Sequence, residues 1–177
     1  MTDIVKKNGL NFGIIIGVFS ILVTTMIYIV DVKMFASYWI GILSFFISLI
    51  IAIIAVVKSK KALGGYISFK EAFTVYFIVM VVGSAIGSIF MYILFNLIDP
   101  ASKDIIMEAV IEKTVAMMQS LGSPTGDIKT TVEQIETTDN FSIASQIKSF
   151  IWGLVFYIII GLIVAAAMKK SKPEFEN

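Results

Sequence analysis

The feature that most constrains the fold is a long apolar run without charge, from Ala72 to Ile98. It holds 27 residues. At about 1.5 Å per residue, a helix of this length exceeds the roughly 30 Å apolar core of a bilayer. Three further uncharged runs, 10–30, 38–57 and 149–168, hold at least 20 residues each. Hydrophobic residues make up 58% of the 177 residues, above the roughly 45–50% of soluble domains. The sequence therefore predicts an all-α integral membrane four-helix bundle, a single membrane domain over 1–177.

Turn and capping signals bound the third run. A Gly-Gly pair at 64–65 predicts a turn, because glycine adopts positive φ without strain. Ser68 and Glu71 have the S-x-x-E spacing of a capping box, which predicts a helix start. Asp99 and Pro100 then end the helix and are suited to cap a following one. The first run is longer than the roughly 7–15-residue core of a signal peptide, so we expect an uncleaved span.

The segment between the third and fourth runs, 101–146, is the only long polar part of the chain. Apolar residues recur in it at helical spacing, which predicts an amphipathic helical segment. Four residues of this stripe form a candidate partner-binding face, because methionine adapts to varied surfaces: Met107, Val110, Met117 and Met118. The alternative is that the stripe packs on the bundle or lies in the lipid interface.

The lysines are unevenly distributed between the two sides. Nine lie near one set of span ends: Lys6, Lys7, Lys58, Lys60, Lys61, Lys70, Lys169, Lys170 and Lys172. The other segments hold five lysines and most of the acidic residues. The positive-inside rule therefore predicts cytoplasmic N- and C-termini and an extracytoplasmic 101–146 segment.

Small residues recur in the spans at the spacing of close helix packing. The candidate packing residues are Gly9, Gly13, Gly17, Ser48, Gly83, Gly87 and Gly161. Counting from the span midpoints places Gly17, Ser48, Gly83 and Gly161 near the bilayer centre, so we expect a narrow waist there. The alternative is a polar cavity lined by Ser20, Ser48, Ser84 and Ser88.

Composition excludes several kinds of chemistry. The chain has no Cys and no His, and all 14 basic residues are Lys, which removes thiolate and histidine metal sites and Ser-His triads. We therefore expect no catalytic, cofactor-binding or metal-binding residues, and net charge +1 gives no footprint for nucleic acid. The acids of 101–146, including Glu108, Glu112, Glu133 and Glu136, predict a solvated face rather than a metal site. An enzyme would have to use such acids, or Lys70 and Glu71, and capping already accounts for Glu71.

The spans contain no Asp, Glu, Lys, Arg or His. Proton relays and ion-coupled transport depend on such groups at depth, so their absence argues against a pump. A passive pore lined by carbonyls and hydroxyls stays open.

Two marks in the sequence carry a family resemblance, namely residues 65–73, GYISFKEAF, and Asp99-Pro100 after the third span. With these marks the chain resembles the small bacterial four-span membrane proteins grouped as domain of unknown function 4199. The resemblance covers nearly the whole chain and implies a multi-pass protein of the bacterial inner membrane. It implies no activity, cofactor or catalytic residue.

These observations favour a non-enzymatic structural or accessory subunit of a membrane complex, with the bilayer and other membrane proteins as partners. The first alternative is a small permease or channel for a neutral or lipid-like solute. A second, implied only by the resemblance, is the membrane partner of a lipid-linked glycosyltransferase.

Overall fold

The structure, a computed structural model, describes residues 3–172. The described residues form helices and no strand. The elements in chain order are α1 (Asp3–Val30), the 3-10 turn η1 (Val32–Ala36), α2 (Tyr38–Ala62), α3 (Phe69–Ile93), the π-helical η2 (Leu94–Ile98), α4 (Ser102–Ser120), α5 (Thr125–Thr137) and α6 (Ile143–Met168). Four helices, namely α1, α2, α3 extended by η2, and α6, are long and apolar enough to cross a membrane. The predicted all-α membrane bundle is confirmed.

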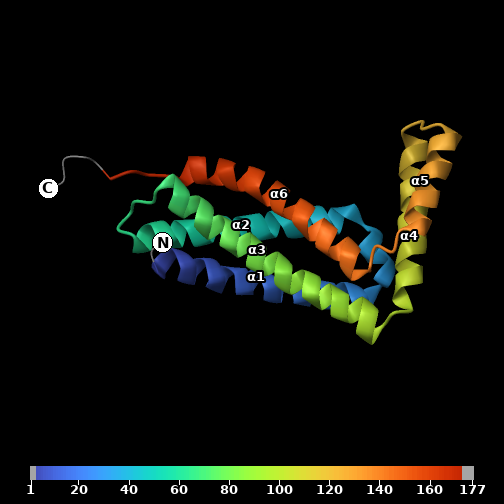
Figure 1. Cartoon of the computed structure of the whole chain (residues 1–177), viewed down its shortest axis with the longest axis horizontal. Coiled ribbons are helices and arrows are strands. Elements are labelled where there is room, and N and C mark those ends of the chain that lie inside the picture. The colour runs from blue at the N-terminus through green and yellow to red at the C-terminus, as the bar shows by residue number, and fades with distance from the viewer. Residues whose placement is uncertain (1–2, 173–177) are drawn as a thin grey trace.

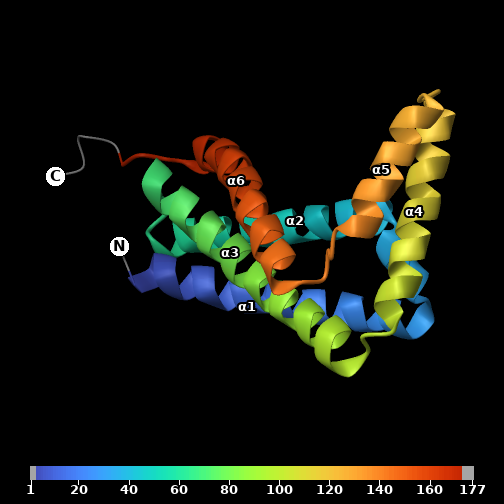
Figure 2. The same ribbon diagram turned by 45° about the vertical axis from the view of Figure 1, so that its right-hand side comes forward.

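The four spans run side by side, and the α4–α5 hairpin stands crosswise to them at one end (Figure 1). Figure 2 shows that the tip of the hairpin reaches beyond the spans. The start of α1 and the end of α6 lie together at the opposite end of the bundle. We call this the terminal end, and the other the hairpin end.

The motif around the Gly-Gly pair closes the terminal end. Both glycines have positive φ, 80° at Gly64 and 88° at Gly65, which reverses the chain after α2. Ile67 then enters the core with 1% of its surface exposed. Its amide donates to the Lys170 carbonyl at 3.0 Å, and the Lys170 amide donates back at 2.8 Å. The turn thus joins α3 to the chain end that follows α6.

Both hydrogen bonds of the capping box are present at the start of α3. The Glu71 amide donates to the Ser68 hydroxyl, and the Ser68 amide donates to the Glu71 carboxylate. The capping box therefore holds the start of α3 directly after the turn.

Glycines bring α1 and α3 close together along most of their length. An added Cβ at each of three α1 glycines would lie under 3.0 Å from a branched side chain of α3. The contacts pair Gly9 with Ile78, Gly13 with Val82, and Gly17 with Ile86. On α3, Gly83 and Gly87 make the reciprocal contacts with Ile16 and Ser20. In lipid there is no hydrophobic driving force between helices. The close approach of α1 and α3 therefore allows van der Waals contacts to hold them together.

The packing is tightest in the terminal half rather than at a central waist. The fully buried side chains there include Val56, Val75, Tyr76 and Val79. Gly161 of α6 joins this half, because a Cβ on it would lie 2.8 Å from the Tyr76 ring. The expected waist of four small residues is therefore wrong. The helices form a wedge that is closed at the terminal end and widens toward the hairpin end.

Candidate functional site

The hairpin half of the wedge encloses a cavity of about 660 Å³, which we call the central cavity. Its walls come from α1, α2 and α3, and η1 lines it at the hairpin end. Each wall helix contributes one face at helical spacing, for example Ser20 and Thr24 on α1, and Ser44 and Ser48 on α2. The cavity is large enough for a small organic molecule.

The cavity lining is rich in hydroxyl groups and contains no charged residue. The lining hydroxyl side chains are Ser20, Thr24, Ser37, Tyr38, Ser44, Ser48, Ser84, Ser88 and Tyr157. The Ser48 hydroxyl donates to the Ser44 carbonyl at 2.8 Å, and the Ser84 hydroxyl donates to the Val81 carbonyl at 3.2 Å. These bonds use the donor of each hydroxyl within its own helix and leave oxygen lone pairs free to accept. The lining therefore suits an uncharged ligand that carries hydroxyl or amide groups.

The cavity ends near the middle of the spans. Ile16, Ser48 and Gly83 line its inner end, and each lies within two residues of the midpoint of its helix. Beyond them the buried core of the terminal half begins. The cavity is therefore confined to the hairpin half of the spans and does not run the length of the bundle.

The predicted polar cavity thus brings together all four of its predicted residues, Ser20, Ser48, Ser84 and Ser88. Ser48, which we also predicted as a packing residue, lines the cavity instead. The prediction missed the other five lining hydroxyl side chains, Thr24, Ser37, Tyr38, Ser44 and Tyr157. Thr24 follows Ser20 by four residues and Ser44 precedes Ser48 by four, so helical spacing was a usable signal for both.

Helix α4 lies over the hairpin end of the cavity and is fixed there by Asp99. The Asp99 carboxylate accepts from the Ser102 amide at 3.3 Å and from the Ser102 hydroxyl, although the N-cap of α4 is Ala101 and not the predicted Asp99. It also accepts from the Tyr28 hydroxyl of α1 at 3.0 Å. The hydrogen bonds from the Ser102 and Tyr28 hydroxyls hold the pKa of Asp99 below its ordinary value of 3.8. The charged carboxylate therefore ties the start of α4 to α1.

A second polar joint links α4 to the start of α6. Lys103 donates to the side-chain oxygen of Asn96 at 2.7 Å, and the Asn96 amide donates to the Phe141 carbonyl at 3.1 Å. Asn96 lies in the π-helical η2, the segment that carries α3 into the hairpin. The rings of Phe35 and Phe141 pack edge-on against Phe95. Together these contacts hold α4 so that Val110 lines the central cavity.

A second space of about 560 Å³, the side cavity, lies between α3, α4 and α6. It shares Ser84, Ser88 and Tyr157 with the central cavity, so the two adjoin along α3. Its lining adds the amides Asn140 and Gln146 and again contains no charged residue. Helices α2 and α6 contact each other through the rings of Phe45 and Phe156, whose centroids lie 5.2 Å apart.

The predicted partner-binding face is divided between two environments. Val110 lines both cavities and Met107 lines the side cavity. Met118 is half-buried, and only Met117, with 46% of its surface exposed, lies open. The four residues therefore do not form one free surface.

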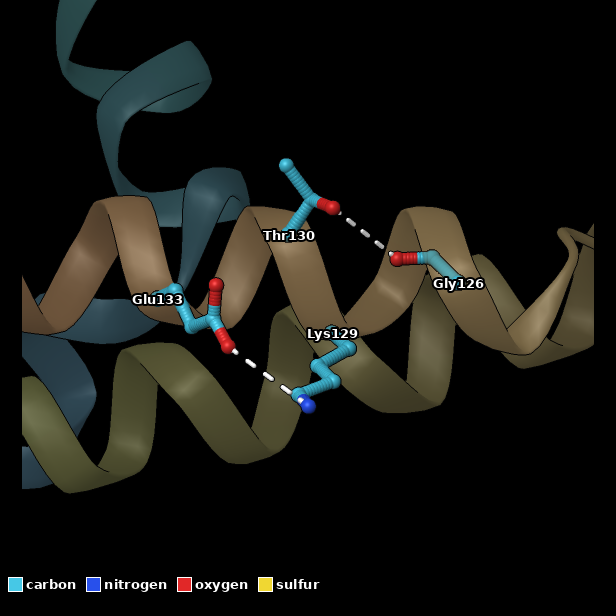
Figure 3. A network of polar contacts seen from close by, with 4 residues as sticks. All are labelled: Gly126, Lys129, Thr130 and Glu133. Atoms are coloured by element: carbon cyan, nitrogen blue, oxygen red, sulfur yellow. Dashed lines mark hydrogen bonds and ion pairs between the residues drawn. The ribbon is translucent and has the colours of Figure 1, made fainter.

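Helix α5 carries exposed polar contacts along its surface (Figure 3). Lys129 and Glu133 form an ion pair at 3.9 Å, and their side chains are 78% and 61% exposed. The Thr130 hydroxyl of α5 also donates to the Gly126 carbonyl, one turn earlier in the helix, at 3.1 Å. An exposed pair of this kind contributes at most about 1 kcal/mol. Among the described residues, no three acidic side chains are grouped in a way that suits a metal ion.

No curated protein and no solved structure matches the sequence. One family does match, over residues 11–170, and its description reads "Protein of unknown function (DUF4199)". Because this match covers nearly all of the four-span bundle, the chain belongs to the DUF4199 family.

Proposed function

We propose that this protein is a non-enzymatic membrane protein that binds an uncharged, hydroxyl-bearing molecule in the central cavity. It would act as a permease or carrier for that molecule. The observation that carries the proposal is the hydroxyl-rich, charge-free lining within the hairpin half of the spans. A solute with hydroxyl groups can donate to the free lone pairs of Ser48 and Ser84 and accept from other hydroxyls. A charged solute would enter without a counter-charge, which is costly at this depth.

The closed terminal half supports a carrier over an open channel. Transport would require α2 to move relative to α1, α3 and α6, opening the terminal end while closing the hairpin end. The contacts favour this division, because glycine packing unites α1 and α3 and Gly161 seats α6 on Tyr76 of α3, whereas α2 and α6 meet through few side chains such as Phe45 and Phe156.

We further propose that the terminal end faces the cytoplasm of a bacterial cell. The nine lysines of that end support this orientation by the positive-inside rule. Trp39 and Trp152, 67% and 66% exposed near the hairpin end, suit the opposite membrane interface. The central cavity would then open to the extracytoplasmic side.

Native mass spectrometry of the protein released from lipid nanodiscs tests the binding proposal. We expect wild type to retain one uncharged molecule, and Ser48→Leu and Ser84→Leu to lose it because the added bulk fills the cavity. Val18→Leu is the control, since Val18 is 50% exposed on the outside of α1. A wild-type protein that carries no such molecule, or variants that retain it, would contradict the proposal.

A role as accessory subunit of a membrane complex is the second candidate. It is favoured by the tip of the α4–α5 hairpin, where Leu121 is 76% exposed and Met117 also lies open. Co-purification in mild detergent tests it. A stable partner lost on Leu121→Glu supports the role, and a protein that purifies alone does not.

A further inference from the structure

An apolar groove on the outside of the bundle leads into the two cavities. It has a volume of about 270 Å³ and lies between α3 and α6. Ala85 and Ile89 line it from α3, and Ile143 and Ile147 line it from α6. All four positions lie in the hairpin half of their spans, and the two α6 positions lie on the turns that precede the uncharged run 149–168.

Ser88 joins the groove to the interior, because it lines the groove, the side cavity and the central cavity alike. Gln146 and Phe150 line both the groove and the side cavity. Polarity thus changes in one direction, from aliphatic side chains outside, through Ser88 and Gln146, to the hydroxyls around Ser84. No charged residue lines any of the three spaces.

We propose that the groove and the cavities form one site for a lipid with an uncharged, hydroxyl-bearing head group. The acyl chain lies in the groove between α3 and α6, and the head group passes Ser88 into the hydroxyl-lined space. This inference rests on the proposed function and specifies its ligand. A water-soluble solute would leave the groove without a role, whereas a lipid accounts for both the apolar and the polar part.

The chemistry of each part fits one end of such a lipid. Hydrocarbon gains little from leaving lipid for an apolar groove, so the groove selects by shape. Binding strength must come from the head group, whose hydroxyls find donors and acceptors in the cavity instead of interfacial water. An anionic head group would be excluded, because no lysine lines the path.

Photo-crosslinking with a monoacylglycerol that carries a diazirine in its acyl chain tests the proposal in nanodiscs of zwitterionic lipid. We expect cross-links within residues 85–92 and 143–150, lost on addition of unlabelled monoacylglycerol but not of phosphatidic acid. Ile147→Trp, which fills the groove, should abolish these cross-links. Ile151→Trp, one turn further along α6 and equally exposed (55% against 54%), should leave them unchanged.

The outcomes separate the two proposals. If Ser48→Leu abolishes the competed cross-links while Ile147→Trp leaves them unchanged, the cavity binds the head group and the groove assignment is overturned. If neither variant matters, or unlabelled monoacylglycerol does not compete, the cross-links report ordinary lipid contact. The lipid proposal then fails, and the binding proposal is decided by the native mass spectrometry alone.

Discussion

The packing of α1 against α3 leads to the most direct prediction about stability. A Cβ added at Gly83 would lie 2.5 Å from Cγ2 of Ile16, 2.8 Å from its Cβ and 3.3 Å from the Gly13 carbonyl oxygen. Carbon atoms pack best at about 3.5–4.0 Å, and a gap of 0.5–1 Å forfeits a quarter to half of each contact. Since Ile16 Cβ and the Gly13 carbonyl cannot rotate away, the helices must separate by about 1 Å. We expect Gly83→Ala to cost about 1–3 kcal/mol, the range of overpacked cores.

This cost has no offset from helix propensity, because a separated span stays helical in lipid. Thermal unfolding in mild detergent, followed by size-exclusion chromatography, measures the loss. Gly41→Ala is the control, since no atom lies within 4 Å of its added Cβ. Gly87→Ala should cost less than Gly83→Ala, because its nearest contact is the Ser20 hydroxyl, which can rotate. The reasoning is refuted if Gly83→Ala unfolds at the same temperature as Gly41→Ala.

Three further predictions concern single polar groups. Ser68→Ala removes the α3 cap and should lower stability by about 0.5–2 kcal/mol, seen as a lower unfolding midpoint. Tyr76→Phe should leave that midpoint unchanged or raise it, because the buried Tyr76 hydroxyl lacks a partner among the described residues; a lower midpoint would indicate an unseen partner. The lowered pKa of Asp99 stabilises the joint above about pH 4, and this stabilisation is lost as pH falls further. The protection factors for hydrogen exchange of residues 101–110, which correct for the intrinsic pH dependence of amide exchange, should therefore fall on acidification in wild type, and Asp99→Asn should show low protection at every pH.

The four spans could be predicted from the sequence, because an uncharged apolar run of about 20 residues or more indicates a helix that crosses a membrane. The sequence was less informative about where helices begin. α1 starts at Asp3 and α6 at Ile143, before the apolar runs at 10 and 149, because a helix continues into the polar interface where charges are tolerated. The capping box at Ser68 depends on local spacing, so it marked the start of α3 to the residue.

The choice between packing and cavity could not be made from the sequence. Within lipid both the buried and the exposed side of a helix are apolar, so periodicity does not reveal which way a serine faces. Gly17 and Ser48 looked equivalent in spacing, yet Gly17 packs against Ile86 and Ser48 lines the central cavity. The position of α4 was equally hidden, because it depends on the Tyr28–Asp99 hydrogen bond between residues 71 positions apart.

The most direct test of the central claim is the water accessibility of the cavity, measured by labelling single cysteines with a membrane-impermeant thiol reagent in intact cells. The chain has no native cysteine, so each label reports one position. We predict that Ser48→Cys and Ser84→Cys react from the extracytoplasmic side, whereas Leu22→Cys, at a position 58% exposed on the lipid-facing side of α1, does not. Unreactive cysteines at both serine positions, in a protein that folds normally, would show a dry interior and contradict a hydroxyl-lined binding site.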